Sequence, residues 1–439
     1  IVVTIEKYIM TKVAVIGAGP MGLAAAYELT KQGKQVDVYE YDDRIGGMSA
    51  HFDFNGMNIE RYYHFVCGQD HPLFELMDEL KMRDKLHWVD TKMGYYYNGQ
   101  LHKWGDPFSL LTFPHLDIIS KLRYGAHMFF SSKRKKEQWQ DLDSLDAVNW
   151  LKKGGGDKSF KVLWERLFKL KFHHYTDNLS AAWIWARIRR MGQSRRSIFQ
   201  EQLGYIEDGS ETLLNRLQEE IEAKGGKVCL NTPVQEVISD SHKVTAVKVA
   251  DKEIPYDQVI STIPLQYVPD IIPQLPDEHL RQYKQVQNIG VVCLLFKLKK
   301  AVTPNFWLNI SDENFEIPGI IEMSNLRPLS EHTVYVPYYM PQSLDKFKWS
   351  DQQFADEAKA YIKKLNPELS EDDFIDINVS RYAFAQPICQ PDFAHHLPPM
   401  RSTIEGLFIA DTSYYYPEDR SISESIHLGK QLAEMTAYE

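Results

Sequence analysis

A glycine-rich segment near the start of the chain has the spacing of a site for a nucleotide pyrophosphate. Gly17, Gly19 and Gly22 form a G-x-G-x-x-G pattern, with Pro20 and Met21 inside it. The first glycine permits a tight turn, the second lets the backbone approach a phosphate, and the third lets a helix pack closely on a strand. A helix that begins here directs free N–H groups and the positive end of its dipole toward the phosphates.

The segments around this pattern predict a βαβ unit that would position it. Residues 12–16 are apolar enough for a short buried strand, residues 23–32 predict a helix that ends at a glycine, and residues 36–40 predict a second strand. Glu40 closes that second strand. A carboxylate at this position accepts hydrogen bonds from ribose hydroxyls and repels a 2′-phosphate.

A second phosphate-binding element follows directly, because Tyr41 leads into Arg44, Gly46, Gly47 and Met48. Two glycines let backbone N–H groups reach an anion, and arginine supplies a forked donor. An acid followed by a short turn and R-x-G-G resembles the glutathione-reductase-like flavoprotein superfamily. The resemblance implies bound FAD, with Arg44 and the glycine pair against its pyrophosphate and ribityl chain.

Two later segments resemble the remainder of that family's FAD domain. Residues 204–210 precede a predicted helix at 211–224 and predicted strands at 228–230, 234–238, 244–249 and 258–261. The resemblance implies that Val234 pairs its backbone with the adenine and that Asp411 binds the ribityl chain or pyrophosphate. It also places the start of the last helix, at Ser421 and Ile422, beside the flavin, where the helix dipole stabilises negative charge on a reduced flavin.

The three segments occur in the family's order, and the chain is most similar to the monoamine oxidase and protoporphyrinogen oxidase branch. That branch includes phytoene desaturases, and UDP-galactopyranose mutase is a more distant relative. The expected fold class is α/β, with a Rossmann-like FAD-binding domain assembled from residues 10–61, 204–265 and 400–439. Residues 62–203 and 266–399 would form a mixed-sheet substrate domain with a helical cap, including strands near 286–298, 334–340 and 375–382 and a helix at 352–365.

Candidate residues for the substrate chemistry lie in these two insertions. His64 follows a strand pair joined by an Asn-Gly type I′ turn signal, and the resemblance puts this position near the flavin ring. It could contact flavin or substrate and move a proton, or be a packed histidine at a domain junction. Arg187 and Arg190 share one helix face and could hold a phosphate or carboxylate, or belong to a surface charge run. Tyr96, in a second Asn-Gly hairpin, would line a pocket or cover the hairpin.

The predicted function is therefore that of a FAD-dependent oxidoreductase that passes a hydride from a substrate C–H bond to flavin N5, with oxygen or another acceptor reoxidising the flavin. The FAD is expected to be noncovalent, because the family's covalent cysteine precedes the last helix, where this chain has Tyr414-Tyr415-Tyr416-Pro417. Two alternatives stand beside it. One is a non-redox flavoenzyme of the UDP-galactopyranose mutase kind, acting on a nucleotide-sugar, and the other is a catalytically silent FAD-binding partner protein.

Composition limits the partners of the 439-residue chain. A net charge of −10 disfavours nucleic acid, so the expected partner is a small-molecule substrate. Four scattered cysteines without a C-x-x-C pair favour reduced thiols in a cytoplasm. No metal is predicted, because the adjacent pairs His173-His174 and His395-His396 point apart. No apolar run is long enough to span a membrane, residues 1–9 do not resemble a signal peptide, and Met10 is expected to open the domain.

One apolar stretch suggests a further contact. Residues 108–130 predict an apolar helix, and the basic cluster Lys133-Arg134-Lys135-Lys136 follows it. Such a segment is either a cap helix with a solvated end or a peripheral contact with an anionic membrane. The sequence pattern does not indicate an oligomeric state.

Overall fold

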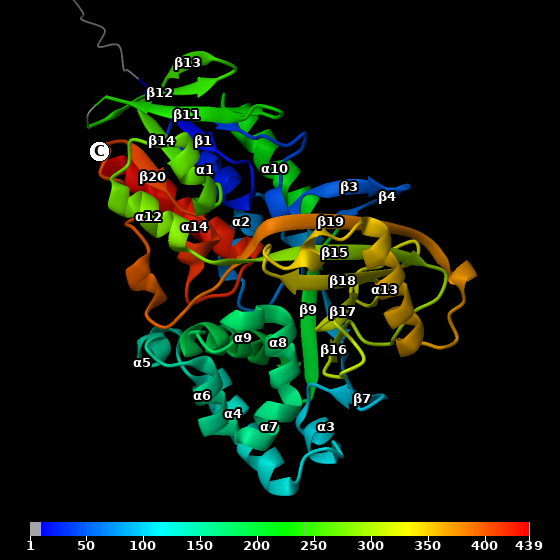
Figure 1. Ribbon diagram of the computed structural model, residues 1–439. Helices are drawn as coiled ribbons and strands as arrows, with labels where there is room; N and C mark the ends of the chain where they lie inside the picture. Colours follow the sequence, from blue (N-terminus) through cyan, green and yellow to red (C-terminus); the bar gives the residue numbers. More distant parts are fainter. Residues whose placement is uncertain (1–9, 241, 439) are drawn as a thin grey trace, which may run out of the picture.

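The computed structural model describes residues 10–240 and 242–438, so the expected extension at residues 1–9 lies outside the described residues. A five-stranded parallel sheet forms one half of the molecule (Figure 1). Its order is β10-β2-β1-β14-β20, with the strands Lys227–Cys229, Gln35–Tyr39, Lys12–Ile16, Gln258–Ser261 and Leu407–Ile409. Strands from three distant parts of the chain thus meet in one sheet, which confirms the predicted Rossmann-like α/β fold.

Helices cover this sheet closely because glycines stand at the contacts. The helix α1 (Pro20–Lys31) packs against α14 (Ile422–Met435) and α10 (Ser210–Ala223). A Cβ on Gly22 would lie 1.9 Å from the Gly17 carbonyl oxygen, and one on Gly429 would lie 2.4 Å from the Met21 carbonyl oxygen. Side chains at these two positions would push α1 off the sheet and α14 off α1. An antiparallel sheet of β11 (Val234–Ser239), β12 (Val244–Val249) and β13 (Lys252–Pro255) and the helices α11 (Val268–Ile271) and α12 (Asp277–Gln285) complete this half.

The other half is built on a seven-stranded sheet of order β19-β15-β18-β17-β16-β6-β7. Its strands are Phe374–Pro387, Asn288–Leu298, His332–Met340, Gly319–Glu322, Trp307–Ile310, Met93–Tyr97 and Gln100–Trp104. β16 and β6 pair in parallel and the other neighbours are antiparallel, so the sheet is mixed, as predicted. The helix α13 (Asp351–Leu365) packs on one face through Phe354 and Ile362. The three strands and the helix predicted for this region are all present.

Two smaller sheets and a helix connect the halves. β3 (His51–Phe54) and β4 (Met57–Glu60) form a hairpin in which Asn55 and Gly56 have φ of 47° and 84°, the backbone that the Asn-Gly pair predicts. β5 (Leu86–Thr91), β9 (Gln200–Ile206) and β8 (Arg195–Ser197) form the second sheet, and α2 (His71–Glu79) precedes it. β9 runs without interruption through residue 204, where the sequence predicts the boundary between the substrate domain and the FAD-binding domain.

A group of helices forms the lower part of the molecule in Figure 1. They are α3 (Pro107–Thr112), α4 (Ile118–Lys133), α5 (Gln140–Asp143), α6 (Ala147–Gly155), α7 (Asp157–Leu163), α8 (Glu165–Phe172) and α9 (Ala181–Gln193). The prediction of one helix over residues 108–130 is wrong, because α3 ends at Thr112 and α4 begins at Ile118. Pro114 explains the break, since proline lacks an N–H donor and disfavours helical backbone in the preceding residue. The Asp117 carboxylate then accepts a hydrogen bond from the Ser120 N–H at 2.9 Å and starts α4.

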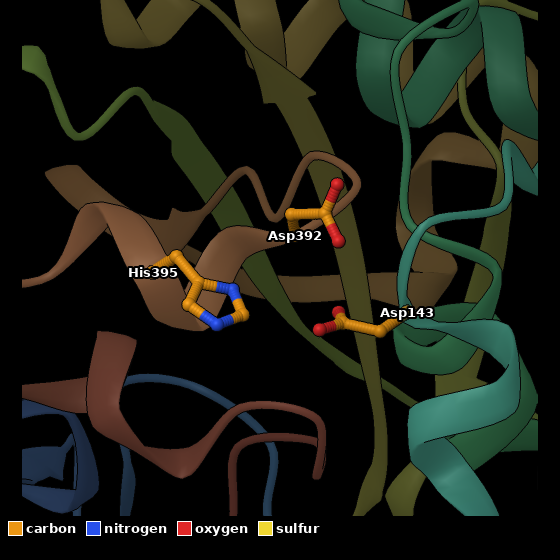
Figure 2. A group of neighbouring side chains, drawn as sticks. All are labelled: Asp143, Asp392 and His395. Atoms are coloured by element: carbon orange, nitrogen blue, oxygen red, sulfur yellow. The ribbon is translucent and has the colours of Figure 1, made fainter.

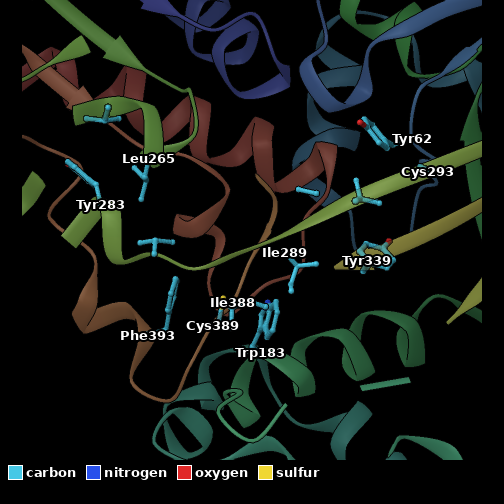
Figure 3. Packing of buried hydrophobic residues seen from close by; sticks show 14 of the residues in the cluster. Tyr62, Trp183, Leu265, Tyr283, Ile289, Cys293, Tyr339, Ile388, Cys389 and Phe393 are labelled. Carbon is cyan, nitrogen blue, oxygen red and sulfur yellow. The ribbon is translucent and has the colours of Figure 1, made fainter. Parts of the chain in front are cut away.

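One apolar core joins these parts (Figure 3). Tyr62, Trp183, Leu265, Cys293 and Tyr339 belong to a single cluster, although they come from widely separated segments. All four cysteines are free, as the sequence predicts. Among residues 10–240 and 242–438, no helix combines the length and apolarity needed to cross a membrane.

Candidate active site

A cavity of about 910 Å³ lies where the parallel sheet, the mixed sheet and the helical cap meet. Most of the residues predicted to bind the cofactor line it: Gly17, Gly19, Pro20, Met21, Glu40, Tyr41, Gly47, Met48, Val234, Asp411, Ser421 and Ile422. The other three, Gly22, Arg44 and Gly46, do not line it. Segments that are far apart in sequence therefore share one enclosed space, as a discontinuous cofactor domain requires.

One end of the cavity has the form of a phosphate cradle. Gly19 caps the N-terminus of α1 with φ −69° and ψ 173°, and a Cβ built on it would have no heavy atom within 4 Å. Gly47 faces it, since a Cβ on Gly47 would lie 3.5 Å from the Gly19 Cα. The open space beside Gly19 lies at a helix N-terminus between two glycine-rich loops, which is the arrangement that binds a pyrophosphate.

Two of these residues, Gly46 and Arg44, stabilise the conformation of the second glycine-rich loop. Gly46 has φ 112°, a conformation that glycine adopts without strain, and its N–H donates to the Ala18 carbonyl oxygen at 2.8 Å. Arg44 donates to the Asp43 carboxylate at 2.6 and 2.9 Å and to the His51 carbonyl oxygen at 2.8 Å. The contacts of Arg44 are therefore with the protein, where the resemblance implied a pyrophosphate contact.

Glu40 joins the two loops at the end of β2. One carboxylate oxygen accepts the Ala18 N–H at 2.8 Å and the other accepts the Asp42 N–H at 2.9 Å. Burial raises the pKa of Glu40, and the two backbone hydrogen bonds act against that shift. The side chain is fixed at the cavity wall and keeps free lone pairs that could accept ribose hydroxyls.

The C-terminal segment forms the facing wall. Buried Asp411 follows β20, and its carboxylate accepts the Leu265 N–H at 3.0 Å and the Ser413 N–H at 2.8 Å. Burial raises the pKa of this carboxyl group. The helix α14 begins at Ile422 after the N-cap Ser421, and both line the cavity. The positive end of the α14 dipole therefore lies at the cavity wall, and its place beside the flavin stays a prediction.

His64 lines a part of the cavity together with Tyr63 and Tyr339, and we call this part the aromatic end. Its Nδ1 lies 2.8 Å from the Tyr62 carbonyl oxygen and its Nε2 lies 3.3 Å from the Ser49 hydroxyl. Burial lowers the pKa of His64 to about 4, and the nearby Glu60 carboxylate acts in the opposite direction. The ring is therefore neutral at pH 7. A carbonyl oxygen only accepts, so Nδ1 carries the proton and Nε2 is an acceptor.

Aromatic side chains form the rest of this end. The hydroxyls of Tyr63 and Tyr339 are 2.7 Å apart, and Trp307 packs edge-on against Tyr63 with ring centres 5.5 Å apart. Burial raises the pKa of both tyrosines, so their hydroxyls stay protonated at pH 7. This end of the cavity offers apolar faces with two hydroxyl groups between them.

Of the three residues predicted to contact the substrate, one lines the cavity and two do not. Arg190 lines the cavity but is paired with Asp70, at 3.0 and 3.2 Å. Arg187 does not line it; this guanidinium pairs with Asp419 at 2.9 Å and stacks 4.0 Å from the Trp183 ring. Tyr96 also lies outside it and packs edge-on against Phe315, on the face of the mixed sheet that α13 covers.

Comparison with known proteins identifies the family. The family described as "Flavin containing amine oxidoreductase" matches residues 22–417. The chain belongs to this family. Among curated proteins, 15-cis-phytoene desaturase from Synechococcus elongatus is 25% identical over 317 residues, 64% of each protein. Protoporphyrinogen oxidase 2 from Arabidopsis thaliana is 29% identical over 148 residues, 33% of this chain and 29% of that protein. The matched part spans less than two thirds of these relatives' lengths.

Solved structures share the fold over nearly the whole chain. A putative protoporphyrinogen oxidase from Exiguobacterium sp. 255-15 matches with a TM-score of 0.77 at 18% identity, covering 98% of this chain and 99% of that one. Cyclohexylamine oxidase from Brevibacterium oxydans matches with a TM-score of 0.74 at 15% identity and the same coverage. The chain thus has the fold of these structures and belongs to the flavin-containing amine oxidoreductase family, whose members act on small molecules, and the sequence resemblance is confirmed.

Sequence reasoning missed several cavity residues of this flavin-containing amine oxidoreductase, among them Lys171 from α8, Tyr339 from β18 and Arg420. Arg420 had a usable signal, because it directly precedes the helix start at Ser421. Lys171 and Tyr339 had none, since only the tertiary fold carries them to the cavity.

Outside the cavity, the fold also brings together three side chains of the kinds that can bind a metal ion (Figure 2). The ligand atoms of Asp143, Asp392 and His395 all lie within 4.8 Å of one another. Asp143 is buried and already accepts a hydrogen bond from the Tyr416 hydroxyl, while Asp392 and His395 are exposed. Exposed acidic groups of this kind are common without an ion, so we assign no metal here, and the expectation of no metal stays a prediction.

Proposed function

We propose that this chain binds FAD noncovalently in the cavity and oxidises a C–H bond of a small molecule held at the end near His64. Bound FAD supplies the hydride acceptor at N5, and oxygen or another acceptor reoxidises it. The observation that carries this proposal is one cavity lined both by the glycine loops at Gly19 and Gly47 and by the aromatic residues Tyr63, Tyr339 and Trp307. A lining that combines open space at a helix N-terminus with aromatic ring faces suits a dinucleotide that carries a reactive ring.

The cradle residues fit the adenine dinucleotide part. N–H groups at the start of α1 and the close approach allowed at Gly19 and Gly47 would bind the pyrophosphate. Glu40 would accept the ribose hydroxyls, and Val234 would pair its backbone with the adenine. In this proposal, residues 10–61, 204–265 and 400–439 form the FAD-binding domain, while 62–203 and 266–399 form the substrate domain and cap.

The other end would orient the substrate and exclude water. The start of α14 at Ser421 and Ile422 would stabilise negative charge at the flavin edge. Tyr63 and Tyr339 present ring faces and hydroxyls that would place the reacting C–H bond. Neutral His64 lines the cavity with its Nε2 3.3 Å from the Ser49 hydroxyl, and we propose that Nε2 exchanges this long contact for a hydrogen bond to flavin or substrate.

The visible absorbance spectrum of the purified protein tests this function, recorded before and after denaturation and during anaerobic addition of donors. We expect a flavin spectrum, release of free FAD on denaturation, and bleaching by one class among amines, tetrapyrroles and unsaturated isoprenoids. A colourless protein that does not take up added FAD would refute the proposal. Flavin that stays attached to the denatured chain would refute noncovalent binding. Flavin that no donor reduces, in a protein that binds UDP-sugars, would favour the nucleotide-sugar alternative.

We also propose that the outer face of α3 and α4 contacts an anionic membrane surface, with the body of the protein in the cytoplasm. In α4 only Ser131 is buried, and the apolar residues face outward: Ile119 is 75% and Phe130 70% exposed. Further exposed apolar side chains of the same face are Phe108, Leu111, Ile118, Leu122 and Phe129. Residues 107–172 carry 13 Lys and Arg against seven Asp and Glu, although the whole chain has a net charge of −10. An apolar helix face on a basic element suits an anionic lipid surface.

Sedimentation with lipid vesicles tests this contact. We expect the protein to sediment with vesicles that contain phosphatidylglycerol and much less with phosphatidylcholine alone. Replacing Ile119→Ser and Phe130→Ser together should abolish sedimentation, whereas Ile375→Ser, at a residue 46% exposed on β19, should not change it. Equal sedimentation of the double variant and the control would contradict the proposed surface.

A further inference from the structure

Lys171, in the last turn of α8, presents a lone ammonium group to the cavity. It is partly buried and lines the cavity wall. Its Nζ lies 5.1 Å from the centre of the Tyr339 ring. Within the part of the chain that the structure describes, Lys171 has no hydrogen bond and no carboxylate within 4.0 Å of its Nζ. An ammonium group in such a place has lost much of its hydration without gaining an acceptor.

Arg420 stands on the same wall with an incompletely used guanidinium. One of its terminal nitrogens donates to the Ala385 carbonyl oxygen, and its Nε is buried without an acceptor among the described residues. Its positive charge acts on His64, Tyr63 and Tyr339, which places it beside the aromatic end of the cavity. Arg420 lines the cavity, and its second terminal nitrogen has no acceptor among the described residues, so this nitrogen is the donor available next to the position proposed for the reacting group.

The charges around Lys171 do not balance. Arg187 from α9 and Arg420 add two positive charges, and Asp419, which is paired with Arg187 at 2.9 Å, supplies one negative charge. The pKa of Asp419 is well below its usual range, because Arg187, Lys171 and Arg420 surround it and outweigh its burial. The carboxylate is therefore ionised, and the group as a whole keeps an excess of positive charge.

We propose that Lys171 and Arg420 bind an anionic group of the substrate, a carboxylate or a phosphate, on the cap side of the cavity. This inference rests on the proposed function, since it names the substrate class of the same site. A bound anion would supply the missing acceptor of Lys171 and compensate the excess charge. The two cations would also anchor the substrate beside the aromatic end, so that its uncharged part meets Tyr63 and Tyr339.

The ionisation of Lys171 gives this site a pH dependence. Burial and the positive charges of Arg187 and Arg420 lower the pKa of Lys171 to about 7, and Asp419 acts in the opposite direction. Tyr339, whose ring lies against the ammonium group, stays protonated at pH 7 because burial raises its pKa. Below pH 7 Lys171 is charged and binds an anion. As the pH rises above 7 it loses its proton, and the affinity for the anion falls.

Anion titration of the FAD-loaded protein tests the proposal, with sulfate in place of a phosphate group and acetate in place of a carboxylate. Neither probe titrates between pH 6 and 9, and loading with FAD fills the pyrophosphate cradle beforehand. Binding is followed by the change in flavin absorbance and by calorimetry at constant ionic strength. The variants are Lys171→Met, which keeps the aliphatic stem, Lys171→Arg, and the control Lys169→Met at an exposed residue of the same helix.

We expect at least one probe to bind the wild-type protein, and the probe that binds distinguishes phosphate from carboxylate recognition. Lys171→Met should weaken binding at least tenfold, Lys169→Met should leave it unchanged, and Lys171→Arg should retain binding without its fall above pH 7. No binding of either probe, or equal binding by Lys171→Met and wild type, would overturn the proposal. A protein that takes up no FAD refutes the proposed function instead, and the same calorimetric comparison on that flavin-free protein then decides the role of Lys171.

Discussion

Replacing Gly19→Ala separates the binding role of the glycine pattern from its structural role. The added methyl group has no neighbour within 4 Å, and the φ of −69° suits alanine. Lower entropy of the unfolded chain would stabilise the variant by about 0.4–1 kcal/mol. Alanine is a poorer N-cap than glycine by a similar amount, so the net change in the free energy of unfolding should stay within about 0.5 kcal/mol.

The effect on FAD affinity should be much larger. In the proposed complex the methyl group occupies the space through which the pyrophosphate approaches the start of α1. The loss of one charge-assisted hydrogen bond costs about 1.5–3 kcal/mol. At about 1.4 kcal/mol per factor of ten, FAD should bind about ten- to hundredfold more weakly. Quenching of flavin fluorescence during titration of the flavin-free protein measures this affinity, and urea unfolding of the same sample measures the stability.

Gly22→Ala is the matched control within the same pattern. Its Cβ would lie 1.9 Å from the Gly17 carbonyl oxygen, so backbone atoms must move, and such overpacking costs about 1–3 kcal/mol or more. We therefore expect this variant to lose both stability and FAD affinity. If Gly19→Ala binds FAD as tightly as the wild type, the open space does not hold the pyrophosphate. If Gly19→Ala instead unfolds at much lower urea, the reasoning about its free volume is wrong.

Three further predictions use other parts of the site. Glu40→Gln keeps the size of the side chain but removes its negative charge, so FAD affinity in the same titration should fall about tenfold, and unchanged affinity would exclude a ribose contact. The pKa of His64 is about 4 in the folded chain and 6.5 in the unfolded chain, so His64 lowers the stability of the fold progressively as the pH falls from 6.5 to 4. His64→Gln should therefore make the urea unfolding midpoint less sensitive to pH in that window. An identical pH profile of variant and wild type would contradict the lowered pKa. Arg189→Met should lower the free energy of unfolding by about 3–5 kcal/mol, because it leaves the buried Glu418 carboxylate without the guanidinium that now lies 2.7 Å away. A loss below about 1 kcal/mol would show that Lys136, 3.4 Å from the same carboxylate, compensates for the missing arginine.

The cofactor half could be predicted from the sequence because its signals are local. The turn at Gly17, the strand before Glu40 and the helix start after Ser421 are each set by a few neighbouring residues, and the structure has all three, with the strand ending one residue earlier, at Tyr39. Strands β15 and β18 were equally clear, since an apolar run that is buried on both faces of a sheet has little other interpretation.

The substrate half could be predicted only in outline, because its contacts join distant residues. Arg187 and Arg190 do share one helix, but their partners Asp419 and Asp70 lie far away in the sequence, so no local pattern showed that both are already paired. Tyr96 fits an exposed hairpin or a pocket equally well by its sequence, and only its packing on Phe315 decides. A side chain's partner across the fold is not encoded by the spacing of its neighbours.

This difference between the two halves bears on how substrate choice is determined. The cradle at Gly19 acts through backbone groups and open space, so it is insensitive to most side-chain changes nearby. The opposite end acts through side chains from α8, β18 and the residues before α14, which are Lys171, Tyr339 and Arg420. Single substitutions at these positions change charge and shape outside the glycine loops of the cradle, because none of the three belongs to those loops. Substrate selection in this fold is therefore best sought at the cap-side residues, and the paired test of Gly19 and Lys171 variants examines the two ends independently.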